Sequence, residues 1–279
     1  MSDDLPLRGG RVRRRGQRRA SRGFSPRRAL AALALLATAG LIWGAVASPV
    51  FRVRTITIDG AGLTGTDAVR AALALPSTPA NAFTVATDVL RERLLALPTV
   101  DDAEVHVGLP GTLGIRVAER EPVLAWRFGD ALLLVDRDGR VLADAAAPGA
   151  AAAADAAAGL PLVTDLRAAG SGPVVGGQID PRELDVATRL LPLTAEEVGS
   201  SAPGMEVSID DEDGWKLVPT VEDPWVAVFG FYGPELRPPD MIPEQVRLLR
   251  SLLDGREDTI LRVVLAGERE GTYVEKPRP

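Results

Sequence analysis

Hydrophobic and polar positions divide the chain into one long apolar run and a longer region of short alternating segments. The apolar run extends from Ala29 to Ala47 and holds nineteen residues without a charged side chain. A helix rises about 1.5 Å per residue, so this run covers about 30 Å, the thickness of a bilayer's hydrocarbon core. The pattern predicts a transmembrane helix over residues 29–47, with Trp43 suited to the lipid–water interface.

The same run has a second interpretation, a cleaved signal peptide. Ala45-Val46-Ala47 has the small-residue pattern of a signal peptidase site, and Arg27-Arg28 before an apolar run is similar to a twin-arginine signal. The apolar region of a secretory signal is about 7–15 residues long. The longer run here favours a retained single-pass anchor.

Residues 50–120 alternate between strand and helix patterns. Val53, Ile56 and Ile58 favour a first strand. Apolar stripes then predict helices over 66–75 and 87–97, and residues 100–109 and 111–119 predict two strands joined by a tight turn. The order strand, helix, helix, strand, strand indicates a small sheet with two helices packed on one face, an α+β unit.

Residues 121–275 predict a second, mixed β domain. Strands are expected over 123–128 and 132–136, a helix after Asp180-Pro181, a hairpin that turns at 211–214, and a buried strand near 225–233. A C-terminal helix follows Pro243, and a last strand over 260–264 is expected at the edge of the sheet. The alanine-rich stretch 143–159 has no large apolar side chain, so it is predicted to be an inserted flexible loop.

Charge is distributed unevenly along the chain. Residues 1–28 contain ten arginines against Asp3 and Asp4, a net charge of +8, so with −6 for the whole chain the rest carries −14. A basic segment before an apolar run stays in the cytoplasm, which predicts a cytoplasmic tail over 1–28 and an extracytoplasmic body. Contact of the tail with nucleic acid or anionic lipid is the other interpretation, but topology alone accounts for its charge, and no nucleic acid is expected.

The composition removes several kinds of catalytic site. The chain has no cysteine and one histidine, His106, which alternates with Val105 and Val107 as a solvent-facing strand residue does. Disulfides, thiolate nucleophiles and zinc sites built from cysteine are therefore excluded. The aspartates of 136–141 lack the further ligands of an EF-hand calcium loop, and a turn at Asp138-Gly139 is favoured. No catalytic residue, metal site or cofactor is predicted.

Glu119, Arg120, Glu121 and Pro122 form a compact charged motif at the end of the predicted strand 111–119. Two carboxylates beside an arginine suit acid–base chemistry, but no nucleophile or second histidine accompanies them. Pro122 lacks a backbone donor and is expected to end the strand ladder, while Arg120 pairs with a neighbouring acid or reaches across the junction. We interpret the motif as a structural junction.

A specific resemblance follows from these residues. "FRVRTITIDGAG" after an anchor, "LLALPTVDDAEVHVGLPGTLGIRVAEREPVLAW" and "LLLVDRDGRVL" closely resemble the FtsQ/DivIB family of bacterial cell-division proteins. The family pattern is met at many positions with fixed spacing: Leu97, Pro98, Val100, Ala103, Val105, Pro110, Thr112, Leu113, Ile115, Val117, Glu119, Arg120, Pro122 and Trp126. The resemblance is strong over residues 50–142 and weaker beyond them, where Asp258, Ile260, Leu261 and Arg262 only approximate the family's last strand.

The resemblance implies a domain organisation and a function. Residues 50–120 would form a POTRA domain, residues 121–275 an FtsQ-type β domain, and Glu119, Arg120 and Pro122 the junction between them. The protein would be a non-enzymatic scaffold in the cell membrane at the division septum. It would bind FtsB/DivIC-like and FtsL-like membrane proteins through the C-terminal part of the β domain.

Two surfaces are candidates for partner binding, since an unpaired strand edge offers backbone donors and acceptors to an extended segment. The first is the last strand with its extension, namely Ile260, Arg262, Val264, Glu268 and Tyr273. The second is the outward side of the first POTRA strand, with Arg52, Arg54 and Thr57.

Two other functions are weighed against the scaffold. A POTRA-containing transport or assembly factor of the envelope would grip extended peptides, but such proteins usually carry several POTRA units, whereas one is predicted here. An anchored cell-wall hydrolase is disfavoured by the scarcity of catalytic groups. What the body binds would separate the three.

Overall fold

The computed structural model describes residues 26–75, 80–168, 172–233 and 236–277, and these fall into two compact units, Met1–Phe51 and Arg52–Pro279. In the first unit, helix α1 (Pro26–Ala47) is followed by a short 3-10 helix, Pro49–Phe51. The segment Pro26–Val46 is long and apolar enough to cross a membrane, and none of it is buried in the protein. A basic tail was predicted for residues 1–28, and its residues 1–25 lie outside the described part of the chain.

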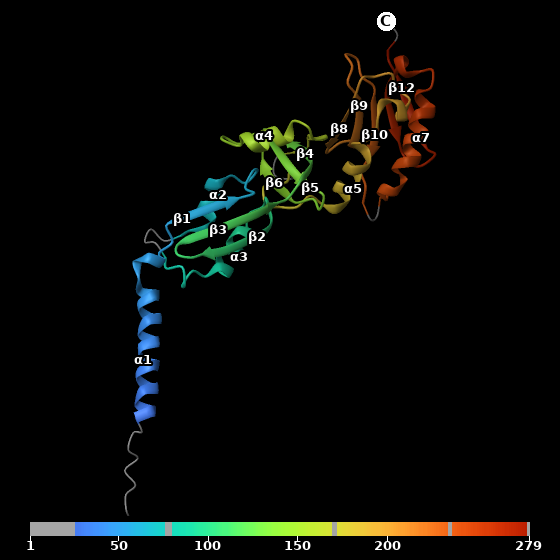
Figure 1. Cartoon of the computed structure of the whole chain (residues 1–279). Coiled ribbons are helices and arrows are strands. Elements are labelled where there is room, and N and C mark those ends of the chain that lie inside the picture. The colour runs from blue at the N-terminus through green and yellow to red at the C-terminus, as the bar shows by residue number, and fades with distance from the viewer. Residues whose placement is uncertain (1–25, 76–79, 169–171, 234–235, 278–279) are drawn as a thin grey trace, which may run out of the picture. The chain divides into compact units, whose positions relative to one another are not determined.

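The second unit begins with a three-stranded sheet of order β1-β3-β2 (Figure 1). Strand β1 (Thr55–Asp59) runs parallel to β3 (Thr112–Glu119), and β2 (Val100–Gly108) pairs with β3 as an antiparallel hairpin. Helices α2 (Thr66–Leu73) and α3 (Thr87–Leu95) lie between β1 and β2 in the chain. The β-α-α-β-β order predicted from the sequence is confirmed.

Apolar side chains from both helices and all three strands form the core of this domain. Val69 and Leu73 of α2 and Leu94 of α3 are completely buried against Leu113 and Ile115 of β3. The apolar stripes that predicted the helices therefore face the sheet, as expected for amphipathic helices on one layer.

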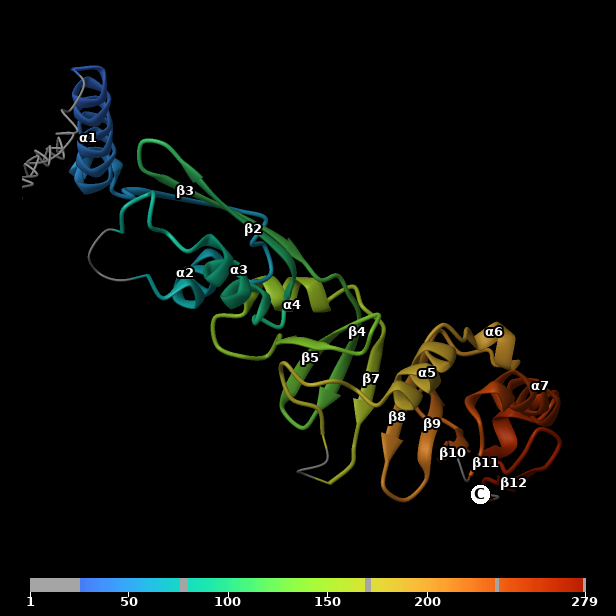
Figure 2. The same cartoon turned by 90° about the horizontal axis from the view of Figure 1, so that it is seen from below.

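A second sheet follows, with nine described strands in the order β12-β11-β10-β9-β8-β7-β4-β5-β6 (Figure 2). Its strands are β4 (Pro122–Phe128), β5 (Ala131–Asp136), β6 (Val141–Asp144), β7 (Leu162–Asp165), β8 (Met205–Asp210), β9 (Gly214–Pro219), β10 (Val226–Gly230), β11 (Ile260–Leu265) and β12 (Gly271–Glu275). The pairs β4–β7, β7–β8 and β10–β11 are parallel, and the others are antiparallel.

Helices pack on this sheet in two groups. Helices α5 (Pro181–Leu190), α6 (Ala195–Val198) and α7 (Ile242–Leu253) contribute to the main core, which includes Leu133 of β5. The neighbouring Leu134 belongs to a separate cluster with Ala153 of helix α4 (Ala151–Ala157). Successive side chains of a strand point to opposite faces, so α4 covers the other face of the sheet from α5 and α7.

The helix α4 corrects a prediction. Residues 143–159 were expected to be a flexible loop because they hold no large apolar side chain. Instead Ala145 and Ala153 are buried beside Leu134 and Leu142. Large side chains on the sheet supply the apolar surface, and small alanines let the helix approach it closely, so a helix without a leucine stripe is still held.

The position of the edge strand also differs from the prediction. Residues 260–264 belong to β11, which lies between β10 and β12 and is not an edge. The edge is β12, formed by residues that were expected to be an extension of the last strand. A C-terminal helix and an edge strand are therefore both present, but the edge lies one strand further along the chain.

Candidate interaction surfaces

The outer side of β12 is one free edge of the large sheet. In the described ranges 26–75, 80–168, 172–233 and 236–277, no strand pairs with β12 other than β11. Most of the strand is exposed, including Tyr273 at 39% and Val274 at 53%. An unpaired edge with exposed apolar side chains offers both backbone hydrogen bonds and side-chain contacts to an extended segment.

Helix α7 fixes how β12 lies on the sheet. Gly271 begins the strand directly beneath the helix, since a Cβ atom there would be 3.1 Å from Leu248 Cδ2 and 3.2 Å from Leu252 Cδ1. Alternation then places Tyr273 on the α7 face and Val274 on the opposite face. The Arg256 guanidinium lies 5.7 Å from the centre of the Tyr273 ring, a cation–π distance.

Buried polar groups hold the turn that connects β11 to β12. The carbonyl of Leu265 accepts hydrogen bonds from Gln245 Nε2 at 3.1 Å and Arg237 Nη1 at 2.7 Å. The Tyr232 hydroxyl donates to Gln245 Oε1 at 2.6 Å, and burial raises the pKa of this tyrosine, which stays neutral. Gln245 is completely buried in α7. Its role was missed from the sequence because its partners lie on distant segments.

The other end of β12 is held by two contacts. The backbone N–H of Lys276 donates to Thr259 O at 2.7 Å, and its ammonium lies 2.8 Å from the Asp223 carboxylate. Glu257, just before β11, accepts hydrogen bonds from Ser201 and Trp225. Burial raises the pKa of Glu257, but hydrogen bonds from Ser200, Trp225 and Ser201 outweigh it, so the pKa is lowered and the carboxylate stays charged.

The predicted partner-binding residues are therefore separated by the structure. Ile260 is completely buried, and Val264 is half-buried on the internal strand β11. Arg262 pairs with the Asp213 carboxylate and faces Val274 in the register of the two strands. Glu268 is exposed in the β11–β12 turn, and Tyr273 lies on the edge. The expectation that Ile260, Arg262 and Val264 line an edge was wrong.

The POTRA edge candidates lie at or beside β1, which is an edge of the small sheet. Thr57 is exposed within β1, and Arg52 and Arg54 are exposed just before it. Arg52 forms an isolated bridge with Asn81, and the Arg54 N–H donates to Gly111 O at 2.8 Å. The two arginines thus precede the regular strand on which they were predicted to alternate.

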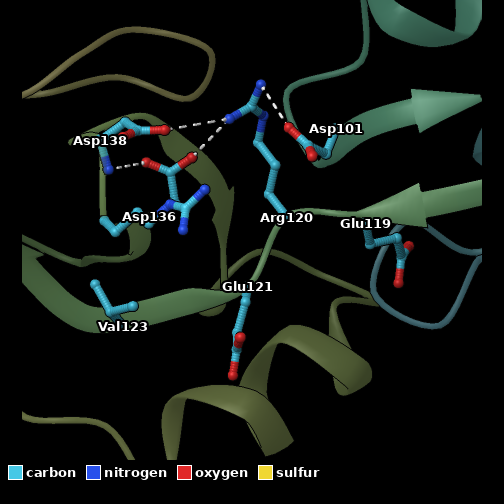
Figure 3. Close-up of a pocket in the computed structure, with 8 residues that line it drawn as sticks. Asp101, Glu119, Arg120, Glu121, Val123, Asp136 and Asp138 are labelled. Carbon is cyan, nitrogen blue, oxygen red and sulfur yellow. Dashed lines mark hydrogen bonds and ion pairs between the residues drawn. The ribbon is translucent and has the colours of Figure 1, made fainter.

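Arg120 spans the junction between the two sheets (Figure 3). Its guanidinium lies 3.2 Å from Asp101 of β2 and 3.1 Å from Asp136 of β5, and its backbone N–H donates to Thr99 O at 2.8 Å. Arg120, Asp101 and Asp136 are among the residues that line a depression of about 230 Å³. Of the two roles expected for Arg120, reaching across the junction is the one observed.

Glu119 and Pro122 have structural positions on either side of Arg120. The Glu119 carboxylate accepts the N–H groups of Leu63 at 2.8 Å and Thr64 at 2.5 Å, which fixes the loop before α2. Leu63 packs against the alanine-rich α4 cluster. Pro122 does not end a ladder as predicted but begins β4, opposite Asp136, a position where a missing N–H is tolerated.

A buried ion-pair cluster was also missed by the sequence reasoning. Arg167 lies 2.7 Å from Asp165 and 2.5 Å from Glu183, and Trp126 Nε1 donates to Asp165 at 3.0 Å. Burial raises the pKa of Asp165, but the hydrogen bonds from Arg167 and Trp126 outweigh it, so the pKa is lowered. Every charge in the cluster has a partner, so its arrangement serves to join β4, β7 and α5.

The sequence of this chain is similar to those of known cell-division proteins. Residues 51–120 match the model of the POTRA domain, FtsQ-type. Similar curated proteins named "Cell division protein FtsQ" come from Jannaschia sp. (44% identical over 33% of this chain and 29% of the relative), Cereibacter sphaeroides (39% identical over 39% and 37%) and Mycobacteroides abscessus (28% identical over 61% and 51%). The matched part thus spans between about a third and a half of these relatives. The resemblance to the FtsQ/DivIB family that the sequence indicated is confirmed.

Proposed function

We propose that this chain, which carries an FtsQ-type POTRA domain, acts as a membrane-anchored scaffold of bacterial cell division. In this proposal it is not an enzyme, and it links FtsB/DivIC-like and FtsL-like membrane proteins at the division septum. The observation that carries the proposal is the combination of this POTRA domain with a large sheet that ends in the exposed edge β12.

The edge of β12 is the proposed binding site for an extended segment of one partner. A partner strand would continue the sheet through main-chain hydrogen bonds, and its alternate side chains would meet the two faces of β12. On one face it would find Val274 and the aliphatic part of Arg262, and on the other Tyr273 under Arg256. The short, ordered strand needs no rearrangement to accept such a partner, which lowers the entropic cost of binding.

Helix α1 is the proposed membrane anchor. The span Pro26–Val46 meets the length and hydropathy of a bilayer-crossing helix, and Arg27 and Arg28 lie at its start. Cytoplasmic retention of the arginine-rich tail would place the POTRA domain and the large sheet outside the cytoplasm. The division apparatus of the outer face of the cell membrane would then be accessible to β12.

The competing function, an envelope transport or assembly factor that grips extended peptides, shares the POTRA fold. The match to the FtsQ-type POTRA model and the names of the similar proteins favour the division scaffold. An edge strand alone does not separate the two functions, so the identity of the bound segment is the deciding measurement.

A binding experiment with two matched variants tests the proposal. The full chain, purified in detergent, is used to capture the extracytoplasmic segments of FtsB/DivIC-like and FtsL-like proteins from the same organism. Val274→Glu introduces a charge on the edge strand and is expected to weaken binding by at least about 1 kcal/mol, roughly fivefold in Kd. Val174→Glu introduces the same charge at a residue that is 68% exposed in the β7–α5 loop, and it should bind like the parent chain.

Three results would count against the proposal. Failure of the folded parent chain to retain either segment contradicts the scaffold function and favours the transport or assembly factor instead. Equal binding by both variants contradicts the β12 site. Equal loss in both variants indicates a nonspecific effect of charge rather than an edge interaction.

A further inference from the structure

Two large apolar side chains are exposed at one end of the POTRA domain. Leu109, in the turn between β2 and β3, is 61% exposed, and Phe83, in the turn before α3, is 50% exposed. Most large apolar residues of the domain are instead packed in its core. The exposed pair belongs to two turns that are 26 residues apart in the chain, and backbone hydrogen bonds connect both turns to one segment, Arg52 to Arg54.

The segment Arg52 to Arg54 joins these two turns. On one side, Arg54 N–H donates to Gly111 O at 2.8 Å, and a Cβ atom on Gly111 would lie 2.3 Å from the Arg52 carbonyl oxygen, so only glycine permits this approach. On the other side, Val53 N–H donates to Ala80 O at 2.9 Å. The turns that carry Leu109 and Phe83 therefore flank the same three residues.

Asn81 gives the second turn a defined conformation. Its side-chain Oδ1 accepts the Phe83 N–H at 3.0 Å, and its carbonyl accepts the Thr84 N–H at 2.9 Å. Such side-chain-capped turns are ordered locally without core packing. Phe83 is thus displayed on an ordered turn, and we call Arg52, Arg54, Phe83 and Leu109 the entry end of the POTRA domain.

The length of the connecting chain limits how far this end can lie from the last residue of α1. Helix α1 ends at Ala47, five residues before Arg52. An extended chain covers at most about 3.6 Å per residue, so Arg52 lies within about 18 Å of the last residue of α1. The polar headgroup layer on each side of a bilayer is about 5–8 Å thick. A bilayer that contains α1 is therefore within reach of the entry end.

The side chains of the entry end match the chemistry of such a surface. Leucine and phenylalanine enter the boundary between headgroups and acyl chains, and exposed arginines are attracted to anionic headgroups. Arg52 and Arg54 are the charged residues between Phe51 and Thr57, although the body as a whole is acidic. Apolar and basic side chains on one ordered end form the pattern of a peripheral lipid contact.

We propose that the entry end of the POTRA domain docks on the anionic bilayer surface through Phe83 and Leu109, with Arg52 and Arg54 facing lipid headgroups. This contact rests on the proposed membrane anchoring by α1. It would restrict the orientation of the POTRA domain on the membrane, so that the chain is held by more than a single helix and a short connection.

The absence of cysteine allows a direct test with single-cysteine variants of the full chain. Leu109→Cys is labelled with a polarity-sensitive fluorophore and reconstituted into vesicles of phosphatidylcholine and phosphatidylglycerol. Lipids with a nitroxide in the headgroup region should quench the label, and its emission should shift to the blue relative to Val174→Cys. Vesicles of phosphatidylcholine alone should reduce both effects because they remove the anionic attraction.

A third variant separates this contact from the membrane anchor. Leu36→Cys, in the middle of α1, should be quenched by nitroxides placed deep in the acyl chains if the helix spans the bilayer. If the label at position 36 is quenched while the label at position 109 behaves like that at position 174, membrane anchoring by α1 is supported and the docking contact is overturned. If Leu109 shifts to the blue without quenching by any nitroxide lipid, protein rather than lipid covers it, and the proposal is equally overturned. If Leu36 is not quenched, the anchoring itself fails.

Discussion

Arg120 pairs with a carboxylate of each of the two sheets, Asp101 of β2 and Asp136 of β5. It has 23% side-chain exposure and pairs with Asp136, whose side chain is only 4% exposed. The other carboxylate oxygen of Asp136 accepts the N–H groups of Asp138 and Arg140 at 2.9 and 2.8 Å. The same aspartate therefore closes the β5–β6 turn and receives the arginine from the POTRA domain. Removing the arginine would leave a nearly buried carboxylate oxygen without its cation.

Replacement of Arg120 by alanine is expected to lower the free energy of unfolding by about 1–3 kcal/mol, the cost of leaving a buried acceptor unpaired. Urea denaturation of the purified chain, followed by tryptophan fluorescence, measures this change. Arg116→Ala is the matched control, because Arg116 lies on β3, which ends just before Arg120, and it pairs with Glu104 at the surface with 68% and 66% exposure. Exposed pairs contribute about 0–1 kcal/mol, so equal effects of the two substitutions would contradict the junction role of Arg120.

The pH dependence of stability tests whether Asp165 stabilises the fold through its charge or through the packing of its side chain. Its side chain is inaccessible to solvent, and its pKa is lowered from the ordinary 3.8 in the folded protein. A lowered folded pKa gives stability that is fully present above the unfolded value and is lost as pH falls through the folded value. The stabilisation by this carboxylate should therefore persist at neutral pH and begin to fall at acid pH, as the pH drops below the unfolded value of about 4.

Asp165→Asn keeps the size of the side chain but removes its charge beside Arg167. The variant should be less stable by about 3 kcal/mol at pH 7, toward the lower end for a broken buried pair because Glu183 still pairs with Arg167. Measured by urea denaturation between pH 3 and pH 7, the difference from the parent chain should shrink below pH 4. A difference that is constant across this range would show that packing, rather than the charge, is lost.

At the scale of elements, the local sequence pattern predicted a helix or strand correctly where the element buries one regular row of apolar side chains in a large core. Asp180 caps α5 with a hydrogen bond to Arg182 N–H at 2.8 Å, and Pro181 occupies the first turn, as the sequence predicted. The edge strand was misplaced because Gly271–Glu275 has no buried alternation of its own and is defined by pairing with β11. Such pairing is a non-local property that strand periodicity does not contain.

Buried polar residues were the other part that the sequence did not reveal. Gln245 lies in the helix α7 among Ile242, Val246 and Leu249, where its position follows the apolar stripe. Its partners Tyr232 and Leu265 come from segments 13 and 20 residues away. In the sequence, a glutamine on an apolar helix face only interrupts the apolar pattern, because its partners are not visible there. The residues that fix the β11–β12 turn could therefore be identified only from the structure.

The helix α4 tests whether alanine-rich packing is tight. Ala153 is 4% exposed against Leu134 and Leu142, whereas Ala152 on the same helix is exposed. Ala153→Leu should lower the free energy of unfolding by about 1–3 kcal/mol through overpacking. Ala152→Leu adds the same methyl groups on the solvent side and should change stability by less than about 0.5 kcal/mol. Equal, small effects in urea denaturation would mean that α4 is only loosely held, as the original loop prediction implied.

At the scale of the whole molecule, the distribution of charge has consequences for both ends of the chain. The body after residue 28 carries a net −14 and the tail a net +8. The acidic body would be repelled by an anionic membrane. The two arginines of the entry end, just after α1 in the chain, instead provide local positive charge that such a membrane would attract. The same asymmetry predicts topology, because a tail rich in arginine is retained in the cytoplasm while acidic residues have little effect on orientation.

The topology can be measured with the same cysteine-free background. In intact spheroplasts, Val174→Cys should react with a membrane-impermeant maleimide, whereas Ser21→Cys in the basic tail should react only after the membrane is permeabilised. Replacing the arginines of residues 8–22 by glutamine removes most of the tail's positive charge and should make Ser21→Cys reactive from outside in a fraction of the molecules. If Val174→Cys is protected in spheroplasts of the parent chain, the large sheet faces the cytoplasm, and β12 has no access to extracytoplasmic partners. If it is released into the medium instead, α1 is a cleaved signal rather than an anchor.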